Sequence, residues 1–286
     1  MIRYDVSPDQ LEALVEAEKP GWIADAIATT AELIADGQYS DKSLEWGDVK
    51  PVFMALQFNK CIFCEQQMEG ERIHHDLEHF RPKSGIKKWP KRADEDLFDF
   101  ELGDKSDIGY FWLAYDLQNY AAACKFCNTS LKSNYFPIKG LRTLTPGTNV
   151  GALNGAELPL ICYPIGRLDT KPSQILDFDI TLAIPATKSG KRHDRARVMI
   201  EFFQLNERDD LHYQRALFIQ LMFEGLEQDD TRKTDFLLSD RAPHSACLRA
   251  FHKLWKTDHA RAMEAYDACR DVVFDALVNE TPNLGV

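Results

Sequence analysis

Residues 61–64 read Cys-Ile-Phe-Cys and residues 124–127 read Cys-Lys-Phe-Cys, and these two pairs decide how the middle of the chain folds. Two thiolates separated by two residues on a tight turn point at one tetrahedral site, and a second pair completes a four-sulfur shell for Zn²⁺ at about 2.3 Å per bond. Because sulfur closes all four positions, such an ion is structural. The sequence therefore predicts a structural zinc site formed by Cys61, Cys64, Cys124 and Cys127.

A long segment is inserted between the two pairs. Residues 65–123 separate them, several times the roughly 15–20 residues between the pairs of a simple zinc ribbon. Within this insert, residues 74–83 read HHDLEHFRPK. In an extended strand Glu78 and His79 point to opposite faces. A bend at the strand end, helped by Pro82, is therefore needed to bring both side chains into one pocket.

Residues 74–83 and the residues after the second cysteine pair contain polar groups that could form a reactive site. Glu78 and Asn128 offer the carboxylate and amide oxygens that a hard divalent ion prefers, and leave coordination positions open for water and phosphate. His79 is a candidate general base, because the unperturbed pKa of histidine lies near operating pH. Asp76 is placed to support the hydration shell of the ion.

The pattern resembles the HNH endonuclease family, whose core is a ββα-metal fold. The resemblance rests on the two cysteine pairs, on residues 77–83 and on the later run from Asn119 to Asn128. It implies that Glu78 is the acidic metal ligand and His79 the general base. It also implies that Asn119 braces the loop and orients the base, and that Asn128 replaces the final histidine as second metal ligand. The long stretch from His79 to Asn119 departs from the family pattern and indicates an insertion between two strands.

A wider resemblance covers about residues 46–215. Residues 157–160 (ELPL), 175–178 (ILDF) and 204–207 (QLNE) look like the HNH subunits of bacterial anti-phage systems of the Septu type, which also occur with some retrons. In those systems an HNH nuclease works beside an ATPase subunit. The resemblance therefore implies an ATPase partner from the same operon, and the helical C-terminal third is the natural place for it to dock.

Together these residues predict metal-dependent hydrolysis of phosphodiester bonds in DNA or RNA. His79 would remove a proton from the attacking water, while Mg²⁺ or Mn²⁺ held by Glu78 and Asn128 offsets charge on the phosphate. Two other classes of protein stay open: a catalytically silent zinc module that binds nucleic acid, and a zinc-stabilised module that serves assembly. Metal-dependent cleavage that is lost on His79→Ala separates the enzyme from both.

The charge distribution limits how nucleic acid is bound. A formal net charge of −11 opposes broad binding to phosphates. Residues 79–92 (HFRPKSGIKKWPKR) nevertheless contain no acid and place Trp89 among basic side chains. The acidic residues of 94–107 follow at once, and they either pair with the basic stretch or mask it until a substrate or partner displaces them. The candidate phosphate contacts are Arg81, Lys83, Lys87, Lys88 and Lys132.

Composition places the chain among cytoplasmic globular proteins. Its 286 residues, 44% of them hydrophobic, can bury a substantial core. No stretch approaches the roughly 20 apolar residues of a membrane helix, and the N-terminus lacks a secretory pattern, which predicts a cytoplasmic protein with no membrane partner. In a reducing cytosol the single cysteines Cys162, Cys247 and Cys269 are buried thiols. His74 and His75 either add ligands or belong to an exposed loop, and exposed loop histidines are the commoner case.

Helical periodicity flanks these motifs on both sides. Ser7 and Pro8 begin a first helix, with a second expected over 22–35 and a third over 47–57. Residues 140–185 are rich in Pro, Gly, Thr and Asn and predict loops and short strands. Further helices are expected over 195–203, 208–227, 231–238, 246–256 and 258–278.

The expected fold is α+β and predominantly α-helical, with a ββα-metal core and a four-cysteine zinc site between N-terminal and C-terminal helices. The expected organisation has four parts. These are an N-terminal helical segment at 1–59, a nuclease core with the zinc site at 60–137, a connection of loops and short strands at 138–189 and a C-terminal helical region at 190–286.

Overall fold

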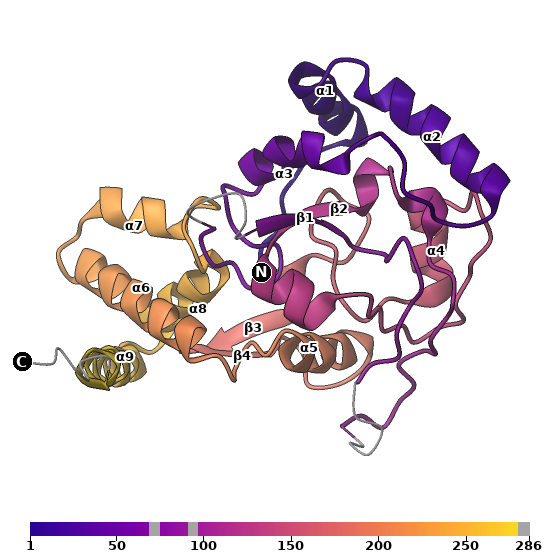
Figure 1. Cartoon of the computed structure of the whole chain (residues 1–286). Helices are drawn as coiled ribbons and strands as arrows, with labels where there is room; N and C mark the ends of the chain where they lie inside the picture. The colour runs from indigo at the N-terminus through magenta and orange to yellow at the C-terminus, as the bar shows by residue number, and fades with distance from the viewer. Residues whose placement is uncertain (69–74, 91–96, 280–286) are drawn as a thin grey trace, which may run out of the picture. The chain divides into compact units, whose positions relative to one another are not determined.

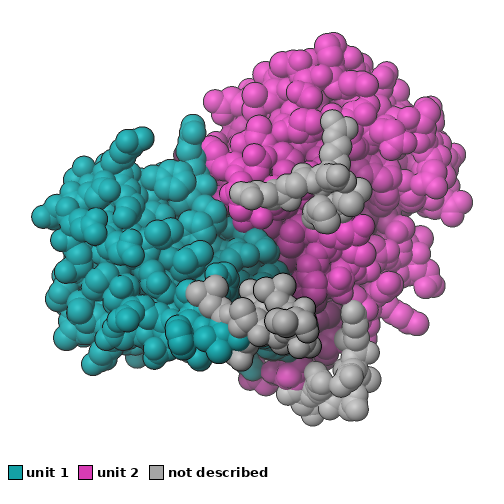
Figure 2. All heavy atoms as spheres, turned by 60° about the vertical axis from the view of Figure 1, so that its left-hand side comes forward, with its two compact units in different colours: residues 1–2, 64–66, 173–286 teal, residues 3–63, 67–172 magenta. Residues whose placement is uncertain are grey.

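The chain forms two compact units, shown in different colours in Figure 2. Unit 1 consists of Met1–Ile2, Cys64–Gln66 and Ser173–Val286, and unit 2 consists of Arg3–Phe63 and Gln67–Pro172. The N-terminal helices and the residues around His79 thus belong to the same unit. The described elements are mostly helices, with short two-stranded sheets, which confirms a helix-rich α+β fold.

The computed structural model describes residues 1–68, 75–90 and 97–279. The predictions made for His74, for Lys91 and Arg92 and for the start of the acidic block at Asp94 fall outside these residues. Among the helices that are described, none combines the length and the apolar character needed to cross a membrane.

Unit 2 begins with two helices whose ends are set by local sequence. α1 (Pro8–Glu18) starts at a capping box, in which the Ser7 side chain accepts a hydrogen bond from Gln10 N and the Gln10 side chain accepts one from Ser7 N. α2 (Trp22–Asp36) ends at Gly37, whose φ of 70° is the left-handed conformation that glycine adopts without strain. The two helices that the sequence predicted here are confirmed.

A two-stranded antiparallel sheet carries the central motif. β1 (His75–His79) pairs with β2 (Tyr120–Cys124), so that His75 lies opposite Cys124 and His79 opposite Tyr120. η1 (Trp46–Val49) leads into α3 (Lys50–Leu56), which contacts both strands (Figure 1). A short helix with π-type turns, η5 (Phe126–Lys132), follows β2 almost directly. The local order is therefore strand, strand, helix.

The other elements of unit 2 lie between and after these strands. η3 (Phe111–Leu113) and η4 (Leu117–Asn119) belong to the segment that separates β1 from β2. α4 (Val150–Glu157) corrects the expectation of loops and short strands for this region. Asn149 caps its first turn, and Leu153 is fully buried. Burial and capping therefore outweigh the low helix propensity of its two glycines.

Unit 1 surrounds an apolar core with helices and adds a β-hairpin. The core contains Ile219, Met222 and Leu248 together with Cys247 and Cys269, all at most 1% exposed. Cys162 of unit 2 is buried as well, so the single cysteines are buried as predicted. The elements are η6 (Pro172–Gln174) at the border, β3 (Leu176–Asp179), β4 (Leu182–Pro185), α5 (Lys191–Phe202), α6 (Asp209–Glu227), α7 (Thr231–Leu238), α8 (Ser245–Thr257) and α9 (His259–Asn279).

Candidate metal centres and active site

Four sulfur atoms converge at the end of β2. The Sγ atoms of Cys61, Cys64, Cys124 and Cys127 all lie within 4.8 Å of one another, and the backbone N–H of Cys127 donates to Cys124 Sγ at 3.5 Å. Four sulfurs bonded to Zn²⁺ at about 2.3 Å lie roughly 3.8 Å apart in a tetrahedron, so this donor set fits zinc. The predicted convergence of the two pairs is confirmed, and the group can hold a metal such as zinc.

A separate pocket of about 380 Å³ borders β1. It is lined by η1, by β1 and the loop that follows, and by residues of η5 and the chain just after it. Three of the four predicted catalytic residues line it, and Pro82 lines it as well. The side chains that bear on its chemistry are Asp76, Glu78, His79 and Asn128, with Trp46, Lys50 and Lys83 around them.

His79 is held as a neutral imidazole with a defined tautomer. Its Nε2 lies 2.9 Å from Ala114 O, and because a carbonyl oxygen only accepts, Nε2 must carry the proton. Nδ1 is then the unprotonated nitrogen. The rings of Trp46 and Tyr120 meet the imidazole edge to face at 5.2 Å and 5.1 Å. Burial, and secondarily the positive charge of Lys83, lowers the pKa of His79 to about 3.

Asn119 braces the chain behind the histidine instead of lining the pocket. Its side-chain oxygen accepts a hydrogen bond from Arg81 N at 2.7 Å. Its amide nitrogen donates to Arg81 O at 3.0 Å and to Leu113 O at 3.1 Å. The residue is fully buried, and its own carbonyl accepts from Phe80 N at 2.8 Å. These bonds fix the two residues that follow β1, which is the geometry of a loop brace.

Glu78 is paired with a buried lysine. Its Oε1 lies 2.9 Å from Lys132 Nζ, and the Lys132 side chain is 0% exposed. Burial raises the pKa of Glu78 above its usual range, although the nearby Lys132 charge opposes this shift. Because Lys132 is closed to solvent and faces a carboxylate, the structure argues against its predicted role as a phosphate contact.

Asp76 and Asn128 form a second pair in the pocket. The Asn128 amide nitrogen donates to Asp76 Oδ2 at 3.0 Å. This bond orients the amide and leaves its oxygen without a partner among the residues that the structure describes. Asp76 and Glu78 alternate on β1 and face the same side of the strand. The pocket therefore offers carboxylate and amide oxygens of the kind that Mg²⁺ and Mn²⁺ prefer.

Arg81 was predicted to contact phosphate, but its side chain is part of the core. The guanidinium is fully buried in an ion pair with Glu157 and donates to Asn154 Oδ1 at 2.9 Å. Its planar group also lies over the rings of Tyr110 and Phe136 at 4.9 Å and 4.7 Å. With its charge balanced and its faces covered, Arg81 has no surface left for a phosphate, which argues against the prediction.

The remaining predicted phosphate contacts differ in their surroundings. Lys83 lines the pocket, and its Nζ lies 3.4 Å from the centroid of the Trp46 ring and 4.5 Å from that of Tyr39. Lys88 lies at the surface and pairs with Asp104 at 3.2 Å, so here the basic and acidic stretches do contact each other. Lys87 is also exposed. Lys83 is therefore the predicted contact that shares a pocket with His79.

Comparison with known proteins gives one partial similarity. No protein-family model and no solved structure matches the chain. The chain is 29% identical over 174 residues to the Septu protein PtuB of Bacillus mycoides (strain KBAB4). This similarity supports the relationship to Septu proteins that the motifs suggested. It covers 60% of this chain and 49% of PtuB, so the chain spans about half the length of that relative.

The sequence did not reveal the residues that surround and hold the His79 ring. Trp46, Tyr120 and the Ala114 carbonyl surround the imidazole, yet none belongs to the motif that contains it. Tyr120 also donates its hydroxyl to Ala114 O at 2.5 Å, which strengthens this support. A tryptophan or an alanine carbonyl carries no local signal of such a role, because only the fold brings it to the histidine.

Proposed function

We propose that the chain is a metal-dependent endonuclease that hydrolyses nucleic-acid phosphodiester bonds as part of an anti-phage defence system. The observation that carries the proposal is the pocket in which His79 lies beside Asp76, Glu78 and Asn128. A neutral imidazole and a cluster of oxygen ligands are the groups that this hydrolysis requires. The strand, strand, helix order around the pocket agrees with a ββα-metal core.

In the proposed reaction His79 acts through Nδ1. This nitrogen takes the proton of a water molecule as the water oxygen attacks phosphorus, and the bond to the leaving 3′ oxygen breaks on the opposite side. Asp76, Glu78 and Asn128 are the residues that would hold Mg²⁺ or Mn²⁺. A divalent ion bound there offsets negative charge on the phosphate and on the leaving oxygen. The Ala114 carbonyl accepts a hydrogen bond from Nε2 and so keeps the proton on that nitrogen. Nδ1 is then free to accept the proton of the water.

Lys83 is the proposed contact to the substrate phosphate. Its ammonium is held against two aromatic rings in the same pocket, and it has no ion-pair partner among the described residues. An ammonium group donates to phosphate oxygens as a point charge. Zinc bound by the four cysteines is proposed to be structural, because a shell of four sulfurs leaves no position for water.

The decisive experiment is a cleavage assay on the purified chain. Supercoiled plasmid DNA and total RNA are incubated with Mg²⁺, Mn²⁺ or EDTA, for the natural protein and for His79→Ala. Cleavage that needs the divalent ion and is lost in the variant supports the proposal. Cleavage that survives EDTA, or that the variant retains at more than roughly a tenth of the natural rate, contradicts it.

A partner is proposed because of the similarity to PtuB. In the proposed system the chain acts in the cytoplasm beside an ATPase subunit encoded in the same operon, and is restrained until that partner engages it. The net charge of −11 agrees with weak intrinsic affinity for duplex DNA. Copurification with the product of the neighbouring gene, followed by a comparison of cleavage at matched concentration, tests this. Indiscriminate cutting by the lone chain at physiological salt would contradict restraint.

One contact favours a second candidate, a catalytically silent module that binds nucleic acid. Lys132 already balances the charge of Glu78, as it would in a pocket that holds no cation. Such a protein binds oligonucleotides yet leaves them intact at every Mg²⁺ or Mn²⁺ concentration. Oligonucleotide binding measured in parallel with cleavage therefore distinguishes it from the nuclease.

A further inference from the structure

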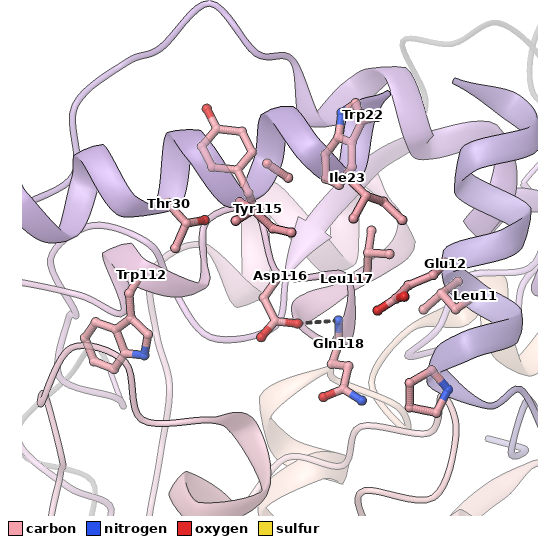
Figure 3. Close-up of a pocket in the computed structure, with 13 residues that line it drawn as sticks. Leu11, Glu12, Trp22, Ile23, Thr30, Trp112, Tyr115, Asp116, Leu117 and Gln118 are labelled. Carbon is pink, nitrogen blue, oxygen red and sulfur yellow. Dashed lines mark hydrogen bonds between the residues drawn. The ribbon is translucent and has the colours of Figure 1, made fainter. Parts of the chain in front are cut away.

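A second pocket of unit 2, with a volume of about 450 Å³, has no part in the proposed nuclease chemistry. It lies between α1, α2 and residues 112–118 (Figure 3). Its walls are largely apolar and aromatic, and Figure 3 shows two carboxylate side chains, Glu12 and Asp116, directed toward its interior. The lining side chains include Glu12, Trp22, Ile27, Trp112, Tyr115 and Asp116.

The aromatic side chains of the walls offer no free donors. Trp22 Nε1 donates to Glu45 O at 3.2 Å, and Trp112 Nε1 donates to Thr148 O at 2.9 Å. The Tyr115 hydroxyl donates to Leu44 O at 3.1 Å. Every polar hydrogen of these three rings is therefore used inside the protein. These rings are at most 4% exposed, so an occupant would meet mainly aliphatic groups and the edges of the rings.

The charged groups of the pocket are acceptors. Asp116 accepts one hydrogen bond, from Gln118 N at 2.8 Å. Glu12 is exposed on α1. Neither carboxylate has a cation partner among the described residues. Burial raises the pKa of Asp116, although the hydrogen bond from Gln118 N opposes this shift. Such a pocket repels phosphates and carboxylates and favours a cation with several donors.

An apolar surface extends from the pocket along α2. Ile23, Ile27 and Thr30 line the pocket, and Ile34 continues the same stripe at helical spacing. Ile27 is 68% exposed and Ile34 is 41% exposed. Exposed isoleucines two turns apart on one helix face form an apolar surface that another polypeptide can cover. A small amine bound in the pocket would leave these isoleucines exposed to water, whereas a polypeptide segment would cover them.

We propose that this pocket docks a segment of a partner protein that carries an arginine between apolar residues. The guanidinium would pair with Asp116 and Glu12. The apolar neighbours would cover Ile27 and Ile34. Arginine fits better than lysine because its planar group carries several donors and can pair with two carboxylates at once. This docking site is independent of the nuclease pocket and of the proposed reaction.

The test selects ligands without assuming the partner. A display library of random dodecapeptides is panned against the full chain, and the enriched peptides are synthesised with arginine or with its neutral isostere citrulline. Affinities are measured by titration calorimetry against the natural protein, Asp116→Asn and Glu12→Gln. Asparagine can still accept from Gln118 N, so Asp116→Asn preserves the local turn. Glu18→Gln, on the same helix but outside the pocket, is the matched control.

Enriched peptides should share a basic residue among apolar ones. Citrulline, or either pocket variant, should weaken binding by about tenfold, as expected for one lost charge-assisted contact, while Glu18→Gln should not. The proposal would be overturned if the enriched peptides lacked a common basic residue, or if they bound the natural protein and all variants with equal affinity. It would also be overturned if panning enriched no peptide. Binding of free arginine amide as tight as that of the peptides would make the ligand a small molecule, and this too would overturn it.

Discussion

His79 of unit 2 and His244 of unit 1 are physically alike in most respects. They are 9% and 1% exposed, and burial lowers the pKa of each to about 3. Each ring has a hydrogen-bond partner, Ala114 O for His79 and the Gln214 side-chain oxygen for His244. The difference lies in what surrounds them. His79 borders a pocket with acidic and amide side chains, whereas His244 packs against Phe218.

This comparison shows that a depressed pKa alone does not mark a catalytic histidine. Both imidazoles are neutral at pH 7 because taking a charge out of water is costly, and that cost is the same in a core as in an active site. The two histidines differ in the surroundings of the ring nitrogen that carries no proton. Nδ1 of His79 is available beside oxygen ligands in a pocket, and the fold supplies no equivalent group of acids around the His244 ring in the described contacts.

The largest expected effect comes from removing the metal that would anchor the region around His79. Cys61→Ser or Cys127→Ser should destabilise the fold severely, because a structural zinc contributes on the order of 10 kcal/mol of folding free energy in small modules. Cys247→Ser, in a residue equally buried but outside the cluster, should have a much smaller effect. Thermal melting compares the variants, and metal analysis should find about one zinc per chain. A natural protein without zinc would refute the site.

His79→Ala should abolish cleavage while the chain stays folded. A general base contributes about 10²-fold or more to the rate, so activity should fall at least that far. Circular dichroism and the zinc content should match those of the natural protein. Initial cleavage rates at saturating Mg²⁺ measure the change. If substantial activity survives, the general base is another residue. His79 would then not differ from His244 in its role.

His244→Ala should give the opposite result. It removes a buried ring and leaves the Gln214 side chain without its partner, which should lower the free energy of unfolding by about 1–3 kcal/mol. The cleavage rate per folded molecule should be unchanged. Urea unfolding followed by tryptophan fluorescence gives the stability, and active-site titration gives the folded fraction. A loss of cleavage per folded molecule in this variant would contradict a purely structural role for His244.

The oxygen cluster beside His79 should bind a divalent ion without help from substrate. Asp76→Asn, Glu78→Ala and Asn128→Ala should each weaken Mn²⁺ binding by about tenfold or more. Electron paramagnetic resonance of free Mn²⁺ measures this independently of cleavage. Asp48→Asn, whose partner Lys19 lies outside the pocket, serves as the control. Equal Mn²⁺ affinity in the natural protein and in the three pocket variants would contradict metal binding in this pocket.

The smallest expected effect concerns Lys83, whose charge also acts on His79. Burial lowers the pKa of Lys83 to about 8. Its ammonium is thus present below pH 8 and is lost as the pH rises through that value. Affinity for a non-cleavable phosphorothioate oligonucleotide should decline severalfold over this interval, and Lys83→Met should remove the decline. Lys88→Met, in the exposed part of the same basic run, should keep it.

The sequence by itself determined those features that depend on local spacing. Each cysteine pair needs only a tight turn to point two sulfurs at one ion, α1 begins at the Ser7 capping box and α2 ends at Gly37. Burial of the single cysteines and the strand at Glu78 and His79 also follow from composition and short-range pattern. The Septu resemblance drew on the same local motifs and was supported by the similarity to PtuB.

Only the tertiary structure decided which polar side chains face water, which face a pocket and which are buried. Arg81, Lys83 and Lys132 look alike in the sequence, yet the first pairs with Glu157, the second lines the pocket and the third pairs with Glu78. Each partner comes from a distant part of the chain. Local spacing carries no information about such contacts, because charge compensation and burial depend on which segments the fold brings together.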